Sequence, residues 1–136
     1  MEEPFLVRLP RDQDLLTSIT RAFQERSIKK AGFTVIGAVT KAALAYYDLA
    51  SRQYGRREFP GAHELVSCTG NVSEKDGETF VHAHVVLGDK DFKCVGGHLA
   101  EGTTILVAEL YGTPLSGEIP VRKFDEATGL ALWPEG

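Results

Sequence analysis

Three of the four histidines of this chain lie in one short stretch, residues 78–102. His82 and His84 are two positions apart in Thr79–Leu87, a segment with apolar residues at the alternate positions. Successive side chains of a β-strand point to opposite faces, so a strand here places both imidazoles on the face opposite the apolar residues. His98 follows after a turn-rich segment, and a hairpin would return it beside the first strand. The spacing indicates that three imidazoles can converge.

Three neutral imidazoles are a ligand set of catalytic zinc sites, which leave one coordination position open. From the residues alone, the pattern is compatible with zinc or another divalent transition metal. The alternative is a group of exposed strand histidines without a ligand. The fourth histidine, His63, begins another predicted strand, and we interpret it as a structural or interface residue.

Two carboxylates, Glu64 and Glu109, interrupt otherwise apolar segments. A buried charge needs a partner, which could be a metal-bound imidazole, a metal-bound water or an arginine. Beside a metal-bound water either residue could act as a general base, so both are candidate catalytic residues. The favoured alternative is a buried salt bridge or a contact across a subunit boundary. Asp89 and Asp91 flank a lysine after a glycine and are interpreted as turn residues.

The elements that position these residues begin with a predicted strand, Phe5–Leu9, and a helix. Asp12 is predicted to cap that helix, because its carboxylate can accept hydrogen bonds from the first turn. Apolar residues recur at helical spacing: they are Leu15, Leu16, Ile19 and Phe23. Gly32 is the predicted stop, and Phe33–Val39, apolar on both faces, is predicted to be a central strand.

A hairpin is predicted from two aromatic-rich segments, Ala42–Asp48 and Tyr54–Phe59. Pro60-Gly61 is then predicted to turn the chain into a separate strand, Ala62–Val72. The turn residues 74–77 lead into the histidine segment. Another apolar segment follows the histidine segment.

That segment, Thr103–Tyr111, is apolar on both faces and is predicted to be central. The pattern indicates one α+β domain spanning 1–136, with a core of about 5–113 and a C-terminal tail of 114–136. Its sheet should be largely antiparallel, or mixed, with one main N-terminal helix. One helix cannot cover so many two-sided strands, so we expect a folded-over sheet or a subunit interface.

Charge and composition limit the classes of partner. The chain has fifteen Lys and Arg and nineteen Asp and Glu, so it is net acidic. This charge balance gives nucleic-acid binding no support. Arg52, Arg56 and Arg57 could form a phosphate-binding patch, although a solvated strand edge is the favoured interpretation. Cys68 and Cys94 match no metal or redox spacing and are expected to be reduced. No signal peptide or membrane-spanning segment is recognisable, so a cytoplasmic location without membrane contact is expected.

Several short motifs occur in the order in which a known domain has them. They are Tyr46-Tyr47-Asp48, Glu64-Leu65-Val66-Ser67, Gly70-Asn71-Val72-Ser73, Val81-His82-Ala83-His84 and Gly96-Gly97-His98-Leu99. From about Phe5 to about Thr113 the chain therefore resembles the PPC domain, the plants-and-prokaryotes-conserved domain. The resemblance implies an α+β domain that assembles as a homotrimer. It also implies a histidine-bound metal, with the HxH ligands at His82 and His84 and the third ligand at His98.

The resemblance bears on activity and partners as well. The implied fold resembles that of acetolactate decarboxylase, an enzyme whose zinc is held by three histidines. Plant PPC members read Gly-Arg-Phe-Glu-Ile-Leu where this chain has Gly61-Ala62-His63-Glu64-Leu65-Val66, so the arginine and the aromatic residue are missing. The Arg-Gly-Arg-Pro core of the plant AT-hook is also missing. Nucleic acid is therefore not an expected partner.

Three functional hypotheses follow. The first is a cytoplasmic homotrimer with a metal site that serves as a binding or regulatory module for an unidentified small molecule. The second is a zinc-dependent enzyme acting on a small carbonyl or carboxylic acid substrate, with Glu64 or Glu109 as the acid or base. The third is DNA binding through the arginines of residues 52–57.

Overall fold

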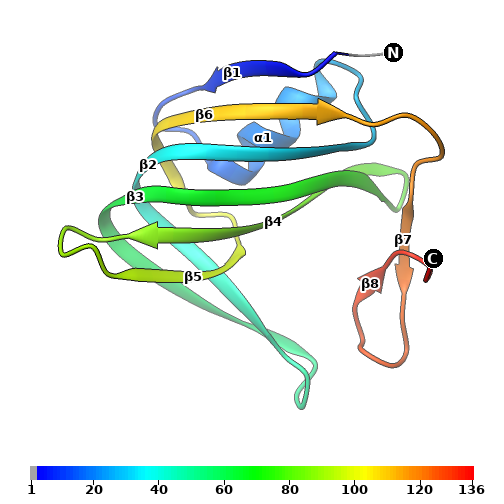
Figure 1. Ribbon diagram of the computed structural model, residues 1–136. Helices are drawn as coiled ribbons and strands as arrows, with labels where there is room; N and C mark the ends of the chain where they lie inside the picture. Colours follow the sequence, from blue (N-terminus) through cyan, green and yellow to red (C-terminus); the bar gives the residue numbers. More distant parts are fainter. Residues whose placement is uncertain (1–2) are drawn as a thin grey trace.

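The computed structural model describes residues 3–136 and contains one helix and eight strands (Figure 1). In chain order these are β1 (Phe5–Leu9), α1 (Leu15–Gln24), β2 (Ala31–Asp48), β3 (Gln53–Lys75), β4 (Glu78–Gly88), β5 (Cys94–Leu99), β6 (Thr104–Pro114), β7 (Val121–Phe124) and β8 (Ala131–Leu132). The strand order is β1-β6-β2-β5-β4-β3-β7-β8. Every pairing is antiparallel except β3 with β7. The predicted α+β domain with a largely antiparallel sheet is confirmed.

The sheet closes on itself through β2. This strand pairs with both β3 and β5, and each of those pairs with β4, so the four strands form a small barrel. β6 lies between β1 and β2, which confirms that Thr103–Tyr111 is mostly a central strand. The first half of β2 lies between β3 and β6, which confirms the same for Phe33–Val39.

The helix covers one face of the sheet. Leu15, Ile19 and Phe23 are fully buried against it, and the ring of Phe23 packs on Phe5 and Phe33 at centroid distances of 5.6 and 5.8 Å. In Figure 1, α1 lies on one side of β1, β6 and β2 and leaves their other side open. The sheet therefore has one face in the core and one uncovered face.

The residue that caps α1 differs from the sequence prediction. Asp14 is the N-cap, and its carboxylate accepts a hydrogen bond from the backbone N of Thr17 at 2.9 Å. Its other oxygen accepts bonds from the backbone N of Gly102 and Thr103, at 2.8 and 3.2 Å. Asp12 instead has a φ of 67°. The prediction that Asp12 is the N-cap was wrong, because the backbone amides just before β6 hold Asp14 at that position.

The Pro60-Gly61 signal does not end a strand. Both residues lie inside β3, where Pro60 is opposite Lys41, and the ladder shifts register between Val39 and Lys41. Gly61, with a φ of 87°, lies beside this bulge. A bulge adds a local bend without ending the pairing, so the prediction of two strands was wrong. Gly32 likewise lies inside β2 and does not stop the helix.

The predicted turns on either side of the histidine strand are confirmed. Asp76-Gly77 joins β3 to β4 with φ values of 52° and 77°, the left-handed backbone that suits a two-residue hairpin. In the next turn, Asp89 Oδ1 accepts bonds from the backbone N of Asp91 and Lys93, at 2.8 and 3.0 Å. The aspartates are therefore turn residues.

Both cysteines are free thiols. Cys68 is fully buried, and burial raises the pKa of its thiol to about 12. Cys94 was expected in a buried strand but is exposed at the start of β5. No helix within residues 3–136 has the length and apolar character that a bilayer crossing requires.

Candidate metal centre

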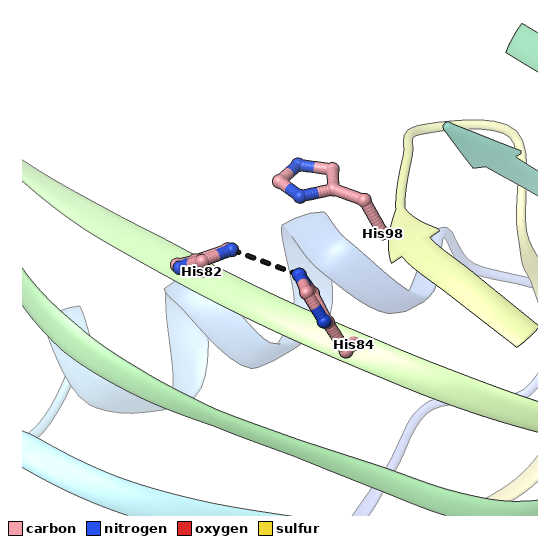
Figure 2. Close-up of side chains that lie close together, drawn as sticks. All are labelled: His82, His84 and His98. Carbon is pink, nitrogen blue, oxygen red and sulfur yellow. Dashed lines mark hydrogen bonds between the residues drawn. The ribbon is translucent and has the colours of Figure 1, made fainter. Parts of the chain in front are cut away.

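The pairing of β4 with β5 brings the three histidines together (Figure 2). His84 is directly opposite His98 in the ladder, and His82 lies on the same face of β4. The ring centroid of His82 lies 4.9 Å from that of His84 and 5.0 Å from that of His98. The centroids of His84 and His98 are 5.6 Å apart. The convergence predicted from the sequence is confirmed.

The local sequence explains this placement. Val81, Ala83 and Val85 are buried on the core face of β4, which turns both histidines of that strand to the other face. Gly96 and Gly97 let β5 come close to its neighbours. A Cβ at Gly96 would lie 2.9 Å from the carbonyl oxygen of Val85, and one at Gly97 would lie 3.1 Å from that of Ala45. The missing side chains therefore allow His98 to approach its partners.

The spacing of the nitrogens fits a metal ion. His82 Nε2 and His84 Nε2 are 3.2 Å apart, and one ring nitrogen from each of the three residues lies within 4.8 Å of the others. Two nitrogens bound to one tetrahedral zinc ion are separated by about 3.3 Å, given bonds of about 2.05 Å. The His82–His84 pair matches that value, and a ring nitrogen of His98 lies within 4.8 Å of both. Imidazole nitrogens suit zinc, copper, iron and nickel.

The surroundings of His82 and His98 favour the neutral form of both rings. Burial lowers the pKa of His82 to about 4, and His98, Arg122 and His84 act in the same direction. The pKa of His98 is also lowered, first by burial and then by His84 and Arg122. Only a neutral imidazole can bind a metal, so these two residues are in the ligand form at neutral pH.

The predicted catalytic carboxylates lie elsewhere. Glu64 and Glu109 are both exposed and belong to no cluster with the histidines. Glu109 is opposite Arg8 and Ile36, and Glu64 is opposite Gly88. The prediction that Glu64 and Glu109 are buried was wrong for the single chain, because the helix leaves this face of the sheet uncovered. His63 also lies outside the cluster, with its Nδ1 3.1 Å from the carbonyl oxygen of Gly61.

A cavity of about 640 Å³ borders the cluster and is lined by His82 and His98. It is also lined by Arg122, Lys75 and Tyr54, which the sequence analysis did not assign to this site. Arg122 reaches the site because β7 pairs in parallel with the end of β3. The segment after Pro114 carries no motif that would have revealed this pairing.

The family model for the Plants and Prokaryotes Conserved domain matches residues 1–115. The chain belongs to this family. The PPC fold of the chain is similar to that of a metal-containing protein from Archaeoglobus fulgidus, with 41% sequence identity and a TM-score of 0.92 over 98% of this chain and 94% of that one. It is also similar to a plant- and prokaryote-conserved protein from Pyrococcus horikoshii, with 39% identity and a TM-score of 0.93 over 98% and 92%.

A solved structure with lower sequence identity shares the fold alone. It is a putative DNA-binding protein from Bacteroides thetaiotaomicron, with 20% identity and a TM-score of 0.90 over 98% of this chain and 93% of that one. No curated protein sequence matches the chain.

Proposed function

We propose that this PPC protein binds a divalent transition metal, zinc or a chemically similar ion, through His82, His84 and His98. The observation that carries the proposal is the convergence of three ring nitrogens within 4.8 Å. The similar protein from Archaeoglobus fulgidus, described as metal-containing, supports it. We further propose that the metal site serves a binding or regulatory module whose ligand is a small molecule. The adjoining cavity supports this part.

The proposal includes self-association, as a homotrimer. Its support is the uncovered face of the sheet, across which the ladders align His84, Thr69, Thr34, Tyr111 and Leu6. Leu6 and Tyr111 are 82% and 49% exposed, and Ile36 on the same face is 55% exposed. Large apolar side chains gathered on an exposed face mark interaction sites. A symmetric oligomer would bury it.

Metal analysis of protein purified without chelator tests the metal site. The wild-type chain should carry about one transition-metal ion, the full occupancy of one three-histidine site. The triple variant His82→Ala, His84→Ala, His98→Ala should carry almost none. His63→Ala is the matched control, because it removes a histidine outside the cluster. Equal metal content in the wild type and the triple variant would contradict the proposal.

A zinc-dependent enzyme for a small carbonyl or carboxylic acid substrate is the second candidate. The cavity favours it, since its volume of about 640 Å³ accommodates a small acid. A bound zinc ion would supply Lewis-acid activation. Of the chain's own residues, His82 and His98 line the cavity and would orient the substrate. No residue that lines the cavity is acidic. Decarboxylation of acetolactate by the zinc-loaded protein, and not by the triple variant, would support this candidate.

DNA binding through Arg52, Arg56 and Arg57 stays a prediction. Arg52 donates a hydrogen bond to the carbonyl of Ala127 and Arg56 to that of Glu101. Arg56 also lies 3.5 Å from the carboxylate of Glu58. Duplex binding that weakens steeply with added salt would support it.

A further inference from the structure

The cavity beside the histidine cluster carries positive groups on walls that are otherwise mainly apolar. Its cations are Lys75, Arg56 and Arg122. The apolar side chains include Leu16, Phe80, Val81, Leu99, Leu130 and Leu132. None of the lining residues is acidic. An anion that enters the cavity therefore meets cations and no opposing carboxylate.

Arg122 is held in place by two hydrogen bonds and two aromatic rings. Its Nη1 donates to the carbonyl of Ala131 and its Nη2 to Asn71 Oδ1, each at 3.3 Å. The guanidinium also lies 5.1 Å from the ring of Phe80 and 4.7 Å from that of Trp133. Within residues 3–136, its buried Nε has no hydrogen-bond partner. A guanidinium stays charged in a protein, so Arg122 brings a positive charge to the wall of the cavity.

Lys75 adds a second positive charge to the same cavity. The parallel pairing of β3 with β7 sets Lys75 opposite Arg122, and the Nζ of Lys75 lies 5.2 Å from the ring of Phe80. The only salt bridge within the described residues joins Arg56 to Glu58, so neither Lys75 nor Arg122 is neutralised by a carboxylate there. Both side chains line the same cavity, so an anion within it is attracted by two positive charges.

We propose that this cavity binds a small organic anion, a carboxylate or phosphate group attached to an apolar body. Arg122 and Lys75 hold the anionic group, and the leucine side chains and Phe80 contact the body. The ligand then lies against His82 and His98, which line the same cavity. Its contact with a metal ion rests on the proposed function. The anion site itself does not.

Fluorescence of the sole tryptophan, Trp133, provides a readout that is independent of activity, because its ring lies against Arg122. The probes are hexanoate, hexyl phosphate and hexanamide, titrated into chelator-treated and zinc-loaded protein. At least one anion should bind saturably, and about tenfold or more tighter than the neutral amide, the effect of one charge-assisted interaction. The preferred anion tells a carboxylate ligand from a phosphate ligand.

Charge-removing variants test the residues. Lys75→Gln and Arg122→Gln should each raise the dissociation constant of the preferred anion by about tenfold. Lys123→Gln is the matched control, since it removes the same charge from an exposed neighbour on β7. Arg122 also holds the C-terminal segment, so Lys75→Gln decides the outcome if Arg122→Gln does not fold by circular dichroism.

Three results would overturn the anion site: no saturable binding of either anion to either form, equal binding of hexanamide, or equal affinity in Lys75→Gln and Lys123→Gln. The failure of the metal site looks different. Anion binding by the chelator-treated protein, together with no metal in the purified wild type, would remove the metal centre and leave the anion site in place. Metal in the purified wild type, together with no anion binding, would remove the anion site and leave the metal centre in place.

Discussion

His82 has an unusual environment for a histidine that lies beside a cavity. It is half-buried, with Nε2 3.2 Å from that of His84, and the charge of Arg122 acts on it. These surroundings disfavour the imidazolium form and lower the pKa of His82 from 6.5 to about 4. The neutral form of His82 that can bind a metal is thus also the form that the metal-free fold favours.

This link predicts a pH-dependent stability. In the unfolded chain His82 titrates near its usual pKa of about 6.5, so between about pH 6.5 and about pH 4 the unfolded state binds more protons than the folded state. The stability of chelator-treated protein should therefore fall as the pH drops through this window. His98, whose pKa is also lowered, acts in the same direction.

Urea denaturation midpoints at about pH 7.5 and about pH 4.5 measure the effect. The difference between the two midpoints should shrink in His82→Gln and persist in His63→Gln, which changes a histidine outside the cluster. An undiminished difference in His82→Gln would contradict the assignment.

Strand β3 pairs with the histidine strand β4 on the edge opposite β5, and Gly70 lies in this pairing. In the ladders, Gly70 is opposite Phe33 on β2 and Ala83 on β4. A Cβ at this position would lie 2.2 Å from the carbonyl oxygen of His82 and 2.6 Å from the ring of Phe33. The packing of two neighbouring strands therefore depends on the absence of a side chain here.

Gly70→Ala should destabilise the protein by about 1–3 kcal/mol, the usual cost of overpacking, and should weaken metal binding because β4 must move at His82. Gly32→Ala is the matched control on β2, where the nearest atom to a Cβ is 4.0 Å away. That variant should be neutral within about 1 kcal/mol. Urea denaturation and metal titration of both variants measure the effects. Equal stabilities would show that β4 adjusts without cost.

The whole molecule presents an uncovered sheet face that one chain cannot bury. The helix occupies the opposite face (Figure 1). The exposed side chains of β1, β2 and β6 include Leu6, Ile36 and Tyr111. Glu109 and Arg8 lie among them, in the same row as Ile36. An interface here would bury apolar side chains together with charges that can pair across the boundary.

The double variant Ile36→Glu, Tyr111→Glu should therefore disrupt the proposed homotrimer, because it places charges within an apolar contact. Light scattering should give three times the 14.9 kDa chain mass for the wild type and a lower mass for the variant. Phe124→Glu is the control, an exposed apolar residue on β7, outside this face. A monomeric wild type would contradict the proposal.

Local patterns in the sequence were enough to predict much of the site. The alternation along Thr79–Leu87 decides which face carries His82 and His84, because burying the valines leaves only the other face for imidazoles. The turn residues after Gly88 then decide that β5 runs back beside β4. These features depend on neighbours close in sequence, so the pattern predicts them well.

Other features required the tertiary structure. The choice of Asp14 over Asp12 depends on amides at Gly102 and Thr103, far along the chain. The exposure of Glu64 and Glu109 depends on which sheet face the helix covers. Arg122 reaches the cavity only because β7 pairs with the end of β3. In each case the deciding contact joins segments distant in sequence, and only folding fixes which of them meet.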